Sequence, residues 1–122
     1  MNNLFVLGQI ILGAYFLLSG LMHFVRGADM IGWVASKKLP LPAVGVYGTG
    51  VLLALGGLGV MTQMYLPYAY GALIGFLLLA AVTIHNFWAD TNPQQHSVNM
   101  IQFQKNIALA AALLMLLVSS LS

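Results

Sequence analysis

Charged residues are nearly absent from this chain: Lys and Arg number 4, and Asp and Glu number 2, among 122 residues. Soluble domains carry about 25% charged residues. Here the charged fraction is 5% and the hydrophobic fraction is 61%. This composition excludes an ordinary soluble domain. The basic residues are also too few and too scattered to form a nucleic-acid-binding surface, so we expect no nucleic-acid partner.

Cysteine is absent altogether. This absence excludes disulfides, thiolate nucleophiles, iron–sulfur clusters and thiol-ligated zinc as properties of this chain by itself. Any redox role would therefore require a bound cofactor. No spacing of histidines and carboxylates resembles a zinc motif, so we expect no metal site.

Long apolar runs are what the sequence does contain. A membrane-spanning helix needs about 20 mostly apolar residues, and four such runs fit into the chain. We predict spans at about residues 4–25, 43–64, 67–88 and 99–121. The predicted fold class is all-α: a polytopic transmembrane four-helix bundle, forming a single integral membrane domain over residues 1–122.

The segment between the first two spans, residues 28–38, predicts a short interfacial helix. Its apolar stripe includes Trp33, and Lys37 and Lys38 suit its C-terminal end. Pro42 and Pro67 fit the first turns of the second and third spans, because a helix leaves its first N–H groups unpaired anyway.

Small residues recur along the spans. The second span contains Gly45, Gly48, Gly50, Gly56, Gly57 and Gly59. Gly71 and Gly75 share one face of the third span, and Ala108 and Ala112 share one face of the fourth. In lipid such faces allow helix backbones to approach closely, so we expect them to pack helices, with homo-oligomerisation through them left open. A hinge or ligand groove along the second span is the alternative.

The basic residues indicate an orientation. Arg26, Lys37, Lys38 and Lys105 all belong to the first or third connection. By the positive-inside rule these connections face the cytoplasm and both termini lie outside. Aromatic residues suggest matching interfacial belts, with Phe24, Trp33, Phe87 and Trp88 at the basic level and Tyr65, Tyr68 and Tyr70 at the other.

Polar side chains at membrane depth are candidates for function, and here they gather at one end of the predicted bundle. In an up-and-down bundle the end of the first span, the end of the third and the start of the fourth all meet on the basic side. The candidate ligand-binding residues are His85, His23, Asn106, Lys105, Trp88 and Asn86. We assign no catalytic residue.

Each leading candidate has a second interpretation. His85, predicted one turn inside its helix end, is either a hydrogen-bond or proton partner for a ligand headgroup or a buried histidine bonded to Tyr, Asn or a backbone carbonyl. Lys105 either binds an anionic or carbonyl-bearing ligand, or it extends to the membrane interface or pairs with Asp90. A haem ligated by His23 and His85 between spans one and three is a further alternative, which the position of both histidines near one interface disfavours.

Several segments resemble the DoxX-like family of small bacterial membrane proteins along nearly the whole chain. They are residues 13–24 (GAYFLLSGLMHF), residues 33–42 (WVASKKLPLP), the glycine-rich second span, residues 85–88 (HNFW) and residues 102–109 (QFQKNIAL). The resemblance implies a four-helix integral protein of the bacterial inner membrane. The family takes its name from a quinone-linked sulfur-oxidising complex.

Two functions follow as expectations. The first is a small subunit or binding protein for a hydrophobic ligand such as a quinone, in a redox-linked membrane complex. In that case any enzymatic role would be that of a quinone-linked oxidoreductase subunit, and electrons would come from a membrane or cytoplasmic partner protein. The alternative is a structural or accessory membrane protein with no small ligand, which stabilises an assembly through its Gly and Ala faces.

Overall fold

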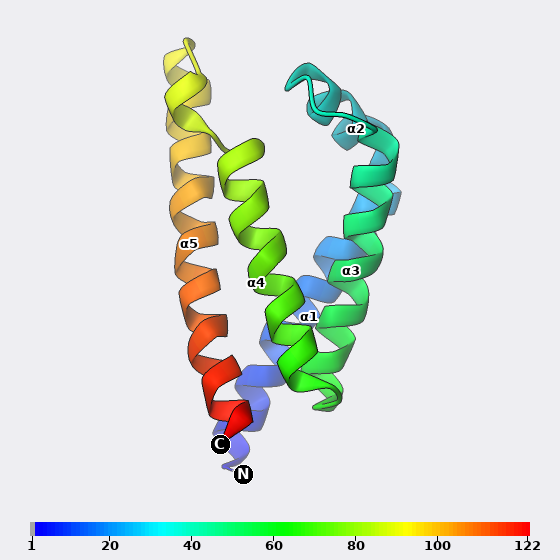
Figure 1. Cartoon of the computed structure of the whole chain (residues 1–122), viewed down its shortest axis with the longest axis vertical. Coiled ribbons are helices and arrows are strands. Elements are labelled where there is room, and N and C mark those ends of the chain that lie inside the picture. Colours follow the sequence, from blue (N-terminus) through cyan, green and yellow to red (C-terminus); the bar gives the residue numbers. More distant parts are fainter. Residues whose placement is uncertain (1) are drawn as a thin grey trace.

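The computed structural model describes residues 2–122 and is helical almost throughout that range. The elements in chain order are α1 (Asn3–Val25), α2 (Gly27–Ser36), α3 (Pro42–Thr62), α4 (Leu66–Thr83), the short 3-10 helix η1 (Phe87–Ala89) and α5 (Pro93–Leu121). Figure 1 shows the four long helices side by side, with both ends of the chain at one end and α2 at the other. No strand occurs in this part of the chain.

The four long segments are apolar enough to cross a bilayer. Candidate spans cover Asn3–Val25, Pro42–Thr62, Leu66–Ala89 and Pro93–Leu121. Much of their apolar surface points outward, as at Ile11, Leu55 and Met115, which are 62%, 64% and 74% exposed. Exposure of such a large apolar surface to water is unfavourable, whereas the acyl chains of a lipid bilayer are equally apolar. The chain is therefore a multi-pass membrane protein, and the predicted all-α class is confirmed.

Two helix ends differ from the prediction. α4 ends at Thr83, whereas the predicted span reached residue 88, and the chain then bends through Ile84–Asn86 into η1. α5 begins at Pro93, whereas the predicted span began at residue 99. The Asn92 side chain accepts hydrogen bonds from the N–H groups of Gln94 and Gln95, so the polar segment starts a helix where a turn was expected.

α1 and α3 are joined by direct backbone contact. A Cβ atom built on Gly57 would lie 2.5 Å from the Gly13 carbonyl oxygen, and one built on Gly20 would lie 2.6 Å from the Gly50 carbonyl oxygen. Only glycine fits at such approaches. The predicted role of the second-span glycines is thus confirmed at Gly50 and Gly57, whereas Gly45 and Gly48 have no neighbour within 4 Å.

α4 and α5 form the second pair, and side chains rather than glycines fill the space between them. The buried core joins both pairs through one cluster of residues from all four long helices. Its buried members are Phe16, Leu53, Val60, Ala69, Tyr70, Leu73, Leu77, Ala110 and Leu113.

Tyr70 belongs to this core, contrary to the belt predicted for it. Its side chain is 1% exposed, and its hydroxyl accepts a hydrogen bond from Gln9 Nε2 at 2.9 Å. Tyr65 and Tyr68 are 74% and 78% exposed, so they remain available to the membrane surface. The Gln9–Tyr70 bond links α1 to α4 near the turn between α3 and α4.

The predicted small-residue faces of α4 and α5 pack no other helix of this chain. A Cβ atom on Gly71 or Gly75 would have no neighbour within 4 Å, and Ala108 and Ala112 are exposed. These faces point to lipid or to a partner. Homo-oligomerisation through them remains a prediction.

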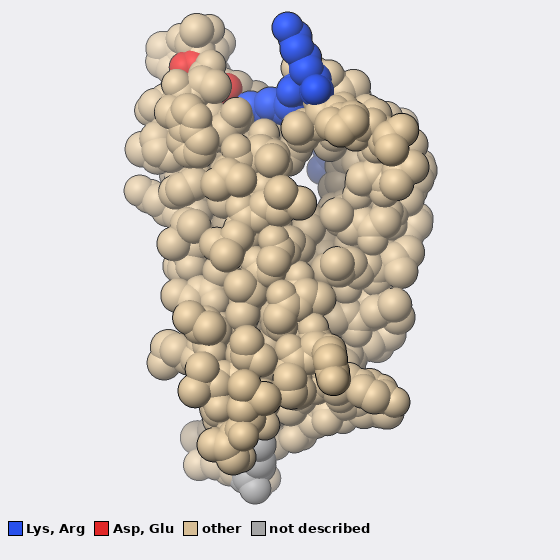
Figure 2. All heavy atoms as spheres, in the orientation of Figure 1, with Lys and Arg blue, Asp and Glu red and all other residues tan. Residues whose placement is uncertain are grey.

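The two helix pairs meet at one end and diverge at the other. We call the end with the termini and the α3–α4 turn the closed end, and the end with α2, η1 and the start of α5 the open end (Figure 1). Figure 2 shows lysine, arginine and acidic atoms gathered towards the open end. The polar candidate residues therefore lie where the helices are furthest apart.

A polar cleft between two helix pairs

The divergence of the two pairs leaves a cleft of about 630 Å³ towards the open end. Figure 2 shows it as a hollow below the lysines. Apolar side chains such as Phe16, Leu53 and Phe76 line its deeper part. Its polar lining includes Tyr15, Ser19, His23, Arg26, Asp29, Thr49, Thr83, His85, Asn99, Gln102, Lys105 and Asn106.

His85 lines the cleft from the bend that follows α4, not from within the helix as predicted. Its Nδ1 atom lies 3.2 Å from Asn99 Oδ1. Asn99 Nδ2 donates to Asp90 Oδ2 at 2.8 Å, and Asp90 Oδ1 lies 3.7 Å from Lys37 Nζ. A chain of four side chains thus connects the ammonium group of Lys37 to the imidazole of His85.

His23 lines the same cleft from α1. Its Nδ1 atom lies 2.7 Å from the carbonyl oxygen of Ser19, one turn earlier in the helix. Its ring meets Phe76 of α4 edge to face, with ring centroids 6.1 Å apart. The imidazole is therefore held at the wall between α1 and α4.

Lys105 and Asn106 contribute from α5. Lys105 Nζ donates to the Tyr15 hydroxyl at 3.4 Å, which links α5 to α1 across the space between them. Asn106 is 3% exposed and donates to the carbonyl oxygen of Leu77 at 3.3 Å. Its Oδ1 atom has no hydrogen-bond partner among the described residues.

Of the six sequence-derived candidates, the structure brings His85, His23, Lys105 and Asn106 to one cleft. Asn86 is outside its lining and accepts a hydrogen bond from Lys37 Nζ at 2.7 Å. Trp88 is 58% exposed and contacts Phe87 and Phe103 edge to face, away from the cleft.

The expected pairing of Lys105 with Asp90 is wrong. Asp90 pairs with Lys37, at the C-terminal end of α2, and this ion pair crosses the mouth between the two helix pairs. The partner was missed because the sequence does not show that α2 reaches η1. Asn99, which links Asp90 to His85, is a site residue that the sequence analysis did not include among its candidates.

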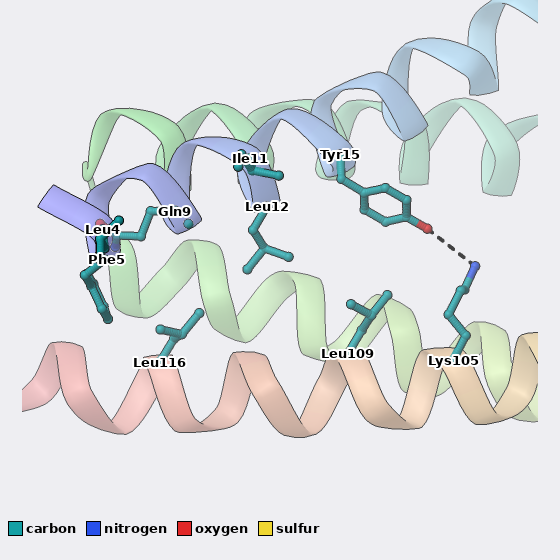
Figure 3. Close-up of a pocket in the computed structure, with 10 residues that line it drawn as sticks. Leu4, Phe5, Gln9, Ile11, Leu12, Tyr15, Lys105, Leu109 and Leu116 are labelled. Atoms are coloured by element: carbon teal, nitrogen blue, oxygen red, sulfur yellow. Dashed lines mark hydrogen bonds between the residues drawn. The ribbon is translucent and has the colours of Figure 1, made fainter.

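A second hollow, of about 660 Å³, lies beside the cleft and is almost wholly apolar. Figure 3 shows Leu12 of α1 and Leu109 and Leu116 of α5 on its sides, with Tyr15 and Lys105 pointing towards each other at one end. Tyr15 and Lys105 line both hollows. A polar compartment and an apolar compartment therefore adjoin at this pair.

This arrangement suits an amphiphilic ligand. Ligand sites are typically apolar concavities with a few convergent polar groups, and the cleft has that character. Imidazole, amide and ammonium groups offer hydrogen bonds to a headgroup, whereas the adjoining hollow offers only dispersion contacts. No group of three or more His, Cys, Asp or Glu side chains lies together within residues 2–122.

A family model described as DoxX matches residues 4–86, which is more than half of the chain. The chain belongs to the DoxX family. The match confirms the resemblance and includes His23 and His85, but it ends before η1 and α5. The α5 wall of this DoxX protein, with Asn99, Lys105 and Asn106, therefore lies outside the matched segment. No curated protein and no solved structure matches the chain.

Proposed function

We propose that this protein binds a hydrophobic amphiphile of the quinone class, with the ring in the cleft and the tail in the adjoining apolar hollow. It would act as a binding protein or small subunit of a redox-linked membrane complex. The observation that carries the proposal is the junction at Tyr15 and Lys105, because these residues line both the polar and the apolar compartment.

The size of the two compartments supports this ligand class. Sites for small organic molecules are typically about 300–1,000 Å³, and the cleft has about 630 Å³. Its polar groups come from the four long helices, from α2 and from the bend after α4, so a ring placed among them would contact both helix pairs. A ligand with this reach would also help to hold the open end together.

Tryptophan fluorescence tests the proposal. The chain has 2 tryptophans; Trp33 lines the cleft, whereas Trp88 lies outside it. We would titrate decyl-benzoquinone into nanodiscs holding the Trp88→Phe variant, which reports on Trp33, or the Trp33→Phe variant, which reports on Trp88. Saturable quenching of Trp33, with only linear quenching of Trp88, is expected. Identical linear quenching of both would contradict the proposal.

His85→Phe in the Trp88→Phe background identifies the polar contact. We expect at least about tenfold weaker binding of decyl-benzoquinol, measured by calorimetry, because the imidazole is lost from the ring site. His96→Phe is the matched control, since His96 Nδ1 lies 2.9 Å from the Phe87 carbonyl oxygen and His96 is not part of the cleft lining. Equal affinity of the His85→Phe and His96→Phe variants would count against His85. A visible spectrum of haem-supplemented protein would detect a bis-histidine haem by its Soret band.

The proposed location is the bacterial inner membrane, with the open end in the cytoplasm and both termini outside. The support is the placement of Arg26, Lys37 and Lys38 at the open end. Because the native chain has no cysteine, single cysteines can be introduced cleanly. We expect an impermeant maleimide added to intact cells to label Gln63→Cys, at the closed end, and not Thr91→Cys. The reverse pattern would invert the topology.

The accessory function remains the second candidate. The exposed small-residue faces of α4 and α5 favour it, because Gly71, Gly75, Ala108 and Ala112 leave room for close approach by another helix. Ligand binding and assembly use different surfaces of the protein, so they can be tested separately.

A further inference from the structure

The free ring nitrogen of His85 is a hydrogen-bond acceptor. The Asp90 carboxylate, paired with Lys37, can only accept, so the Asn99 group facing it at 2.8 Å must be the amide NH₂. Asn99 therefore turns its carbonyl oxygen to His85, and the His85 Nδ1 atom, 3.2 Å away, must carry the proton. A neutral imidazole with its proton on Nδ1 has a lone pair on Nε2.

The Nε2 atom of His23 is also a hydrogen-bond acceptor in the neutral ring, for an independent reason. Its Nδ1 atom faces a backbone carbonyl oxygen at 2.7 Å, and a carbonyl can only accept. In the neutral ring the proton therefore lies on Nδ1, and Nε2 has the lone pair. Neither Nε2 atom has a hydrogen-bond partner among residues 2–122.

Asn106 follows the same rule at the α5 wall. The Leu77 carbonyl oxygen faces the amide NH₂ of Asn106 at 3.3 Å, which leaves Oδ1 as the free group. This oxygen is buried and has no donor within the described chain, an arrangement that native proteins rarely leave uncompensated. Three side chains from three segments thus leave acceptors free around one cleft.

We infer that the cleft selects the hydroxyl-bearing form of its ligand, a quinol or another phenolic ring, over the carbonyl-bearing quinone. The inference rests on the proposed function and specifies its substrate class. Two imidazole nitrogens and one amide oxygen can accept hydrogen bonds from the hydroxyl groups of a quinol. The carbonyl oxygens of a quinone are themselves acceptors, so they would face lone pairs at the same positions. The cationic donors of the lining are Lys105, which donates to Tyr15, and Arg26, which pairs with Asp29.

Asp90 and Asn99 act here as positioning residues. Asp90 is outside the cleft lining, and Asn99, which lies at its edge, is only 1% exposed; their role is to fix which nitrogen of His85 has the proton. With Asp90→Asn, the partner of Asn99 can both donate and accept, so Asn99 can turn over and His85 can adopt the opposite tautomer. With Asn99→Leu, the acceptor behind Nδ1 is removed. Either change should reduce the selectivity between ligand forms more than it reduces affinity for both.

The test compares three matched probes in anaerobic nanodiscs by calorimetry: decyl-benzoquinol, decyl-benzoquinone and the di-O-methyl ether of the quinol. Empty nanodiscs correct for partition into lipid. We expect the quinol to bind at least about tenfold more tightly than either other probe. Binding of the quinone or the ether as tightly as the quinol would overturn this inference but leave the proposed function standing. No binding of any probe above empty discs would refute the proposed function.

The variants test the positioning role. Asp90→Asn and Asn99→Leu should bring the quinol-to-quinone affinity ratio close to one, whereas His96→Phe should leave it unchanged. Thermal unfolding identifies any variant that fails to fold, and the second positioning variant then supplies the answer. An unchanged ratio in a folded Asp90→Asn or Asn99→Leu protein would refute the role of that residue.

Discussion

The closed and open ends of the bundle are built from the same four helices but held together in different ways. At the closed end, a buried apolar cluster joins both helix pairs and a single side-chain bond, from Gln9 to Tyr70, crosses between them. At the open end the pairs diverge, and the Lys37–Asp90 ion pair and the hydrogen bonds of Lys37 and Lys105 cross the gap. Stability is therefore concentrated where the polar groups are fewest.

This difference shows how a small membrane protein can hold a polar cleft without losing its fold. In lipid, helices associate by close packing and not by exclusion of water, so a glycine contact along α1 and α3 can fix one pair. The other end is then free to diverge and to expose imidazole and amide groups.

Gly57→Leu should cause the largest loss of stability. The new Cβ atom would lie 2.5 Å from the Gly13 carbonyl oxygen and 2.6 Å from the Leu17 backbone nitrogen, so α1 and α3 would have to separate. We expect the free energy of unfolding, measured in detergent by SDS titration, to fall by about 3 kcal/mol. Gly48→Leu is the control, because that position has no neighbour within 4 Å. Equal effects of the two changes would contradict the glycine contact.

Tyr70→Phe should cause the next largest loss. It removes the acceptor for Gln9 Nε2, and Gln9 is 3% exposed with its Oε1 atom already unpartnered among the described residues. We expect a cost of about 1–2 kcal/mol. In the Gln9→Leu, Tyr70→Phe double variant no donor is left unpaired, so its stability should recover part of this loss. A double variant with fully additive losses would show that the bond itself contributes little.

Much of the fold could be predicted from the sequence because bilayer thickness sets the length of apolar runs. The pairing of helices could not. Gly13 and Gly20 have the same separation as Gly50 and Gly57, a signal that was present but not recognised. The end of α4 was also missed, because Ile84 and Phe87 are apolar and hydropathy does not register a bend in the backbone.

The candidate site was predictable only in part. The alternating direction of the spans is enough to predict that His23, His85, Lys105 and Asn106 lie at one end of the bundle. Their orientation depends on contacts between distant segments, such as Lys37 with Asp90, that periodicity does not encode. Trp88 was included because the third span was expected to continue to it, whereas η1 turns its side chain outward.

Lys37→Met tests the open end and should affect stability less. It removes the ion pair with Asp90 and the hydrogen bond to Asn86. The two side chains are only 16% and 12% exposed, but Asp90 keeps its hydrogen bond from Asn99 Nδ2, so we expect about 1 kcal/mol of lost stability in the SDS titration. Lys38→Met, which changes the same charge one residue later, is the control. A loss as large as that of Gly57→Leu would mean that the open end, and not the glycine contact, holds the bundle.

Gly71→Leu should have the smallest effect on the isolated chain. A Cβ atom at this position would have no neighbour within 4 Å, and leucine has a higher helix propensity than glycine. The free energy of unfolding should therefore change by no more than about 0.5 kcal/mol. Gly56→Leu is the contrast, because its Cβ atom would lie 3.0 Å from the Leu73 side chain. If the exposed face of α4 mediates assembly, native mass spectrometry should show Gly71→Leu shifting the protein towards monomer. A large loss of stability in the monomer itself would mean that another helix packs on this face, and the divergence that forms the cleft would then be wrong.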